Sequence, residues 1–179
     1  MKKTFLFCLL FAVSGLIAQE KLITKNGKVT FEASVPAFEE VKAKNENVTC
    51  ILNTKTGEIA SLALIKGFRF KVALMEEHFN ENYMESDRYP KAIFKGKIMD
   101  FDLKKLTSSP TDFTIKGKLE IHGKTQEITC IAKVKKTENG IEIITNFDVN
   151  ASDFDIEIPS VVKNKVSNKI NVSNIFLLK

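Results

Sequence analysis

The sequence is poor in the residues and motifs that carry most enzyme chemistry. It has no tryptophan, two histidines and three cysteines. It contains no G-x-S-x-G, no H-E-x-x-H, no glycine-rich phosphate loop and no pair of C-x-x-C motifs. These motifs supply the nucleophiles, metal ligands and phosphate cradles of the common enzyme classes. We therefore predict that the protein is not an enzyme.

The two histidines, His78 and His122, have no nucleophile or second ligand at a motif spacing. His78 with Glu77 and Glu81 can form a weak metal site, because Glu81 follows three residues on along an expected helix. A solvated helix face accounts for the same residues, and we favour it. His122 lies at a hairpin end, where it is either a turn residue or a contact to a ligand head group. We predict no metal and no cofactor.

Long apolar runs are also scarce, and the longest lies at the start of the chain. Lys2 and Lys3 precede an apolar run over residues 5–13, and Ala18 precedes polar Gln19. This arrangement predicts a secretory signal peptide, residues 1–18, cut after Ala18. No later stretch approaches the roughly 18 to 20 apolar residues of a spanning helix. We expect residues 19–179 to form one exported domain, periplasmic or secreted.

The charge balance is mild. Without residues 1–18 the chain has 25 Lys and Arg against 22 Asp and Glu, a net charge of +3. Basic residues such as Lys95, Lys97, Lys116 and Lys118 alternate with apolar ones, so they form the solvated face of a sheet. No arginine cluster or aromatic array supports nucleic-acid binding, whereas a weak, transient attraction to anionic membrane surfaces stays open.

Cys50 and Cys130 are the only cysteines after the predicted leader. Each alternates with apolar neighbours and is expected to point inward. Export permits a disulfide if their strands are neighbours. We slightly favour two buried thiols.

Short segments of alternating apolar and polar residues, separated by turn residues, run through most of the chain. They indicate about eight or nine antiparallel strands, and Asn139-Gly140 is a strong hairpin signal. A sandwich and a closed barrel both fit. The barrel is favoured because one face of nearly every strand is apolar and no second helical layer covers it; its lumen is then wide enough for side chains or one small ligand. The expected strands are residues 28–35, 48–53, 58–65, 67–74, 92–101, 113–122, 125–135, 141–150 and 169–178.

Residues 67–94 join a strand, a helix and a second strand without a break. The period of two in residues 67–74 changes after Leu74, where Phe79 and Tyr83 lie four residues apart. This predicts one amphipathic helix of about three turns that ends near Asp87. A plug or lid over one end of the sheet and a simple cap on the core explain it equally well.

Eleven phenylalanines remain after the predicted leader, more than a small sandwich needs. We predict that inward side chains line the lumen and that Phe79 and Tyr83 guard its entrance. The alternative is that the same side chains pack on one another and leave no cavity. The remaining predicted lining residues are Phe68, Phe70, Val72, Leu74, Phe94, Phe113, Leu119 and Phe147.

Three segments resemble the YceI-like family. They read H-F-N-E-N-Y-M-E-S-D-R-Y-P-K-A-I-F at residues 78–94, G-K-L-E-I-H-G-K-T-Q-E-I at residues 117–128 and S-D-F-D-I at residues 152–156. In the family, similar segments run from a histidine to tyrosine-proline and an apolar strand, around a strand-pair turn, and through a serine or threonine, an aspartate and an aromatic residue. Together they cover most of the chain after the leader in the right order.

The resemblance implies an all-β fold with one short helix, an extended eight-stranded antiparallel β-barrel that is lipocalin-like. It implies that the lumen holds a long apolar lipid, a polyisoprenoid or a similar isoprenoid or fatty amide, often in a homodimer. Asp155 departs from the family, in which glycine is common at this position. The alternatives are an exported structural or interaction protein with a filled core, or a weak metal-dependent enzyme.

Overall fold

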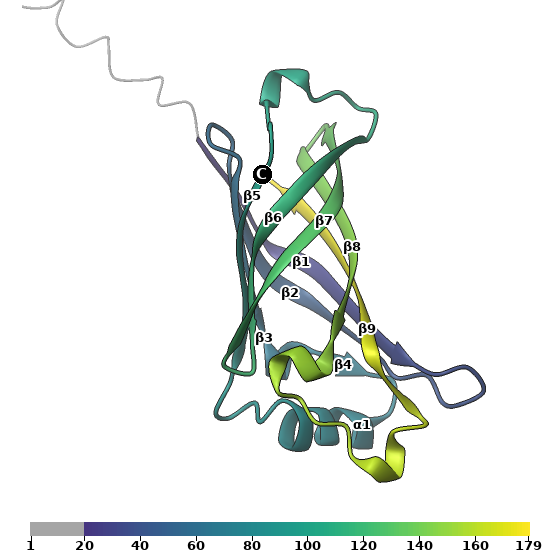
Figure 1. Ribbon diagram of the computed structural model, residues 1–179. Helices are drawn as coiled ribbons and strands as arrows, with labels where there is room; N and C mark the ends of the chain where they lie inside the picture. Colours follow the sequence, from purple (N-terminus) through teal and green to yellow (C-terminus); the bar gives the residue numbers. More distant parts are fainter. Residues whose placement is uncertain (1–19) are drawn as a thin grey trace, which may run out of the picture.

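Nine antiparallel strands form one sheet that curls round and closes on itself (Figure 1). The computed structural model describes residues 20–179, so the predicted signal peptide lies outside the described residues. The strands are β1 (Lys21–Ser34), β2 (Lys42–Asn53), β3 (Glu58–Leu64), β4 (Arg69–Phe70), β5 (Lys91–Ile98), β6 (Thr111–Ile121), β7 (Lys124–Thr137), β8 (Gly140–Asn150) and β9 (Val166–Leu178).

The strand order confirms the predicted eight-stranded antiparallel barrel with one short helix. The order is β1-β9-β8-β7-β6-β5-β3-β2, and pairing between β1 and β2 closes the ring. The two-residue strand β4 also pairs with β2, at Ala43 and Lys44, whereas β3 pairs with β2 further along that strand. The last strand pairs with the first, with Phe31 opposite Val172.

One half of the barrel is filled by its own side chains. Leu52, Ile98, Val134 and Leu178 come from four different strands and are each 0% exposed. Buried Leu106 joins this core from the loop between β5 and β6, which covers the upper end of the barrel in Figure 1. We call this the filled half.

The prediction of a strand over residues 67–74 is wrong except at Arg69 and Phe70, which form β4. The chain leaves β3 through a 3₁₀ turn, Ile65–Gly67. The buried amide of Asn45 stabilises this turn, because its Nδ2 donates to the Leu64 carbonyl at 3.0 Å. A Cβ on Gly67 would lie 2.5 Å from that nitrogen, so only glycine lets the turn approach β2 so closely.

Glu76 then folds the chain back into a helix. Its carboxylate accepts a hydrogen bond from the Phe70 N–H at 3.1 Å and pairs with the Arg69 guanidinium at 2.7 Å. Strand pairing therefore stops at Phe70, and the helix begins three residues later. Val72 directly precedes the helix, and Leu74 lies on its outer side with 57% of its surface exposed.

The predicted helix of about three turns is present, but it begins and ends earlier in the chain than expected. α1 (Ala73–His78) continues as a π-helical turn, Phe79–Tyr83, and ends there instead of near Asp87. Glu85 has a φ of 42°, and the Tyr89 N–H donates to the Glu85 carbonyl at 2.9 Å, so a tight turn leads out of the helix. Within residues 20–179, no helix is long and apolar enough to cross a membrane.

Candidate ligand cavity

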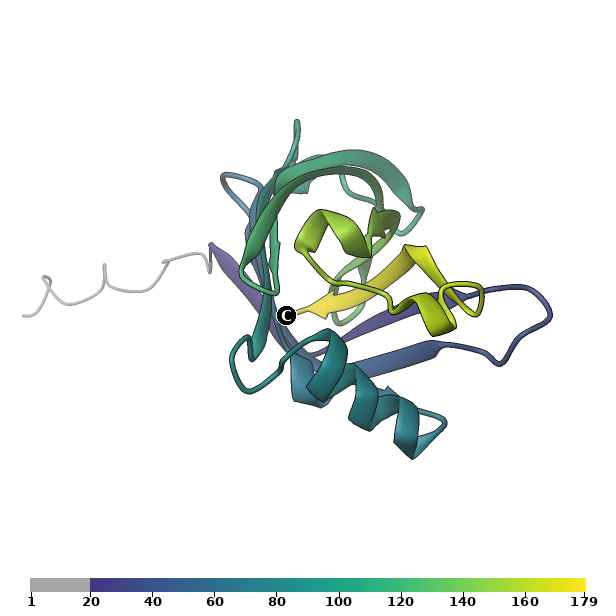
Figure 2. The same cartoon turned by 60° about the horizontal axis from the view of Figure 1, so that its bottom comes forward.

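The other half of the barrel is hollow. A cavity of about 530 Å³ begins where the filled half ends and opens beside α1. This volume lies within the range of small-molecule sites. Ile115, Ile143 and Phe176, which belong to the packed core, form its inner end. Figure 2 looks toward the open end and shows the turn at residues 151–154 within the outline of the barrel, with α1 beside it. We call this the hollow half.

Four phenylalanine rings gather at the mouth of the cavity, and we call them the phenylalanine cluster: Phe31, Phe68, Phe70 and Phe79. The Phe79 ring stacks on Phe31 with centroids 5.2 Å apart and lies 5.1 Å from the Phe70 ring. Aromatic pairs at such distances stabilise by about 0.5–1.5 kcal/mol beyond their burial. The cluster thus fixes the helical segment over one side of the mouth.

The ring of Phe94 lies over two glycines in the wall. Gly96 on β5 pairs directly with Gly117 on β6. A Cβ at Gly117 would lie 2.5 Å from the Phe94 Cζ, and a Cβ at Gly96 would lie 2.7 Å from it. Any side chain at either position would displace this ring, so the width of the lumen here depends on the glycine pair.

A 3₁₀ turn, Ala151–Phe154, inserts an aromatic side chain into the open end of the barrel. Phe154 is 1% exposed and lines the cavity. Asp155 ends the turn in the left-handed conformation, with φ 55° and ψ 30°, a conformation that glycine adopts without steric cost. Its carboxylate bonds Lys124 at 2.7 Å, which raises the pKa of that ammonium and anchors the turn to β7.

His122 lies behind this turn and does not line the cavity. Its Nδ1 is 3.1 Å from the Phe154 carbonyl, and its ring packs against Tyr89 with centroids 4.5 Å apart. Its Nε2 is 3.8 Å from a Glu85 carboxylate oxygen. Its φ of 52° places it in the left-handed turn after β6. This geometry supports the interpretation of His122 as a turn residue and not as a contact to a ligand head group.

Polar groups in the cavity wall fall into two sets. Ser61, Cys130, Thr145 and Asn174 lie on strands within the barrel. The others lie around the mouth, where burial raises the pKa of the Tyr83 hydroxyl. The mouth residues are Glu39, His78, Tyr83 and Lys165.

The two cysteines are free, as we slightly favoured from the sequence, and only Cys130 lines the cavity. Cys50 is 0% exposed within the packed core, and burial raises its pKa to about 12. Cys130 lines the cavity, and burial raises its pKa as well.

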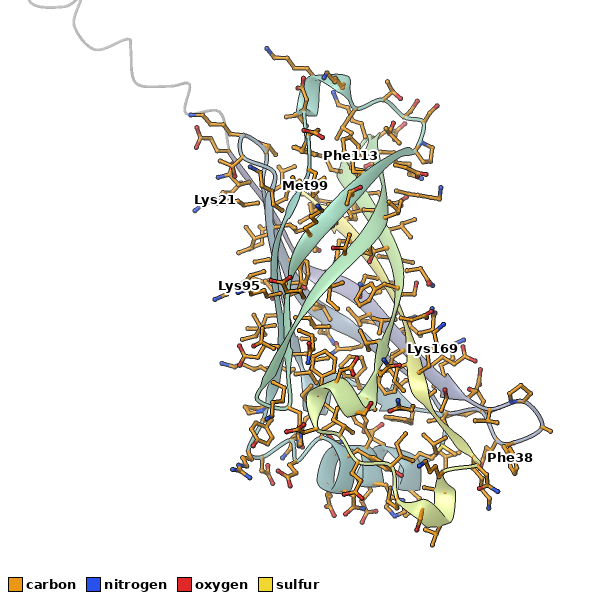
Figure 3. The ribbon with its side chains drawn as sticks, in the orientation of Figure 1. Lys21, Phe38, Lys95, Met99, Phe113 and Lys169 are labelled. Atoms are coloured by element: carbon orange, nitrogen blue, oxygen red, sulfur yellow. The ribbon has the colours of Figure 1, made fainter. Side chains whose placement is uncertain are left out.

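Seven of the ten side chains predicted to line the lumen do line it, and their role in ligand binding stays a prediction. Val72 and Leu74 do not, because that segment forms the start of the helix. Phe113 points inward but lies in the filled half, where its ring packs 6.0 Å from that of Phe101. Figure 3 shows Phe113 at the end of the barrel opposite Phe38. The seven are Phe68, Phe70, Phe79, Tyr83, Phe94, Leu119 and Phe147.

Sequence reasoning missed several lining residues, including Phe31, Phe154 and Phe176. Phe31 carried a usable signal, since it alternates with Val29 and Ala33 along a strand that the pattern identifies. Phe154 carried none, because it lies in a segment without strand periodicity and turns inward only through the 3₁₀ turn.

The residues considered for a metal site do not assemble one. Across the described part of the chain, no three His, Cys, Asp or Glu side chains come together to hold a metal ion. His78 lies at the mouth of the cavity, while Glu77 and Glu81 are exposed on the helical segment.

Several solved structures share this architecture. A polyisoprenoid-binding domain from Saccharophagus degradans implicated in plant cell wall breakdown matches with a TM-score of 0.76 and 14% identity, over 89% of this chain and 98% of that one. BcnA from Burkholderia cenocepacia matches with a TM-score of 0.70 and 14% identity, over 86% and 96%. A Campylobacter jejuni YCEI protein matches with a TM-score of 0.60 and 14% identity, over 100% and 99%. At this identity the likeness shows the fold.

Sequence comparison gives the family. A search of curated proteins finds no match. The profile of the YceI-like domain, in contrast, matches residues 21–174, which include every strand of the barrel except the last few residues of β9. With nearly the whole described chain matched, the protein belongs to the YceI-like family.

Proposed function

We propose that this protein binds a long apolar lipid, a polyisoprenoid or a lipid of similar length, in the hollow half of its barrel. The observation that carries the proposal is the cavity of about 530 Å³ with a mostly apolar wall and a mouth beside α1. The description of the Saccharophagus degradans relative as polyisoprenoid-binding supports this ligand class.

Affinity in such a site comes from removing hydrocarbon from water. Burial contributes roughly 25 cal/mol for each square ångström of apolar surface, and it requires no particular direction. Selectivity then comes from the length and width of the lumen. The inner end at Ile143 and Phe176 limits the length, and the Phe94 ring over its two glycines sets the width at one level.

The mouth suits a ligand that arrives from an apolar environment. Phe38 on the β1–β2 loop is 45% exposed, and Val161 on the 3₁₀ turn Ser160–Val162 is 81% exposed. Large apolar side chains exposed beside a cavity often mark contact with a membrane or a partner. Contact with anionic membrane surfaces and homodimer formation stay predictions.

The proposal includes export. A leader over residues 1–18 would place the barrel in the periplasm or outside the cell. There a protein that encloses a lipid can carry or sequester it without any chemical step.

The test is to purify the protein from the exported fraction, extract it with organic solvent and identify any lipid by mass spectrometry. We expect a stoichiometric apolar lipid in the wild type. Phe70→Asp should abolish retention, because it places a carboxylate within the phenylalanine cluster, where ionised groups are strongly disfavoured. Exposed Lys118 on β6 provides the control, and Lys118→Ala should retain the lipid fully.

Circular dichroism shows whether both variants keep the barrel. Equal retention by the two folded variants rejects this lining of the cavity. A wild-type protein that carries no lipid and takes up none from added polyisoprenoid rejects the function itself.

A further inference from the structure

The apolar wall of the cavity contains one directly bonded polar pair. Thr145 on β8 and Asn174 on β9 are register partners, and the Asn174 Nδ2 donates to the Thr145 Oγ1 at 2.8 Å. Both residues line the cavity, and Thr145 is 5% exposed. A polar pair in such a wall is unfavourable unless its remaining groups find partners.

The pair lies near the inner end of the cavity. Thr145 is one inward position from Ile143, which forms that end, and Val29, which lies opposite Asn174, is one inward position from Phe31 of the phenylalanine cluster. The nearest inward side chains along and across the strands are all apolar. They are Val29, Ala132, Ile143, Phe147, Val172 and Phe176.

The mutual hydrogen bond leaves capacity unused. A threonine hydroxyl can both donate and accept, and a primary amide has two donor hydrogens and one acceptor oxygen. Among residues 20–179, the bond between Nδ2 and Oγ1 is the only side-chain hydrogen bond of either residue. Rotating the amide by half a turn changes which groups remain free, but it leaves free groups either way.

The surroundings select against charge. Apart from His78, the acidic and basic side chains in the cavity wall are Glu39 and Lys165, and all three lie at the mouth. A carboxylate or phosphate at Thr145 would therefore be buried without a counter-charge, which is strongly unfavourable. A neutral hydroxyl, carbonyl or amide would satisfy the free donor and acceptor without that cost.

We propose that the Thr145–Asn174 pair is a binding site for the neutral hydrogen-bonding end group of a long-chain lipid, which enters the barrel polar end first. The inference rests on the lipid-binding function proposed above and narrows its ligand class. The hydrocarbon chain then occupies the rest of the hollow half.

A matched series of probes tests this inference. Oleyl alcohol, oleamide, oleate and 9-octadecene share one chain and differ at one end. Each displaces N-phenyl-1-naphthylamine from the full protein at pH 8, where oleate is ionised. The alcohol and the amide should bind about fivefold or more tightly than the hydrocarbon, because one net hydrogen bond corresponds to about that factor. Oleate should bind more weakly than both.

Variants then assign the effect to the pair. Thr145→Val with Asn174→Leu should remove the advantage of the alcohol and amide and leave the hydrocarbon affinity unchanged or improved. Asn171→Leu is the control, because Asn171 lies on the same strand but is exposed and bonds Asn146 and Asp148. The near-isosteric Thr145→Val alone provides a second variant if the double variant does not fold.

The outcomes separate this inference from the proposed function. Equal affinity for all four probes overturns the end-group site and leaves lipid binding intact. The same holds if the alcohol and amide still bind more tightly than the hydrocarbon in the double variant. That result is expected if an ordered water alone occupies the Thr145–Asn174 pair and the lipid end group binds elsewhere. Failure of all four probes, the hydrocarbon included, overturns the proposed function.

Discussion

The filled half and the hollow half are built from the same strands with the same alternation, yet one is packed and the other encloses a cavity. In the filled half, large aliphatic side chains from neighbouring strands meet, and Leu106 covers them from the β5–β6 loop. In the hollow half, small residues pair across the wall: Ala63 with Ala92, and Gly96 with Gly117. The comparison teaches that side-chain size at paired inward positions, and not the polar–apolar pattern, decides where a barrel stays open.

The two cysteines give the sharpest test of this comparison. At pH 8 the fraction of Cys50 in the reactive thiolate form is lower than that of an ordinary thiol on the order of a thousandfold, because its pKa is raised from 9.0 to about 12. N-ethylmaleimide should therefore modify Cys130 through the cavity and leave Cys50 untouched, as read by peptide mass spectrometry. Bound oleyl alcohol should protect Cys130.

Equal modification of both thiols in the folded protein would show that the packed core around Cys50 opens as readily as the cavity. If Cys130 is modified at the same rate with and without bound lipid, then its side chain does not lie on the path of the ligand.

The same burial predicts a loss of stability in alkali. The folded-state pKa of Cys50 lies above its unfolded value, so its contribution is fully present below pH 9 and is lost as the pH rises toward about 12. The loss is about 1.4 kcal/mol for each pH unit in that window. Urea unfolding at several pH values should show a steeper decline for the wild type than for Cys50→Ala. If the free energy of unfolding falls equally with pH in the wild type and in Cys50→Ala, the result contradicts the burial of Cys50.

Two leucines provide a size-matched comparison of packing. Leu52 is 0% exposed in the filled half, and Leu119 is 8% exposed and lines the cavity. Leu52→Ala should destabilise the protein by about 3–5 kcal/mol, because it creates a new void in a packed core. Leu119→Ala should cost only about 2 kcal/mol, since its side chain already borders open space. Similar urea midpoints for the two variants would mean that the hollow half collapses onto its own wall.

Some of this architecture was accessible from the sequence because it depends on local patterns. Residues 113–121 alternate strictly, and they form β6 as expected. The segment at residues 67–74 shows where such reasoning fails. Apolar and polar residues do alternate in this segment. However, the carboxylate of Glu76 bonds Phe70 and Arg69, and the residues that follow Phe70 fold into a helix. A bond between residues six apart leaves no trace in a hydrophobic period.

The cavity could be predicted only in part for a related reason. Phe113 and Phe147 have the same inward pattern, yet only Phe147 lines the lumen. The pattern gives the face of a strand, but the position along the barrel axis depends on register with neighbouring strands. The Thr145–Asn174 pair belongs to the same class, because only the β8–β9 register brings the two side chains together.

The sequence by itself determined that this chain forms antiparallel strands with one apolar face, since alternation and turn residues act locally. Only the tertiary structure decided that the barrel is packed at one end and open at the other. That outcome depends on which side chains from distant strands share a level, and on whether their combined volume fills the space between them.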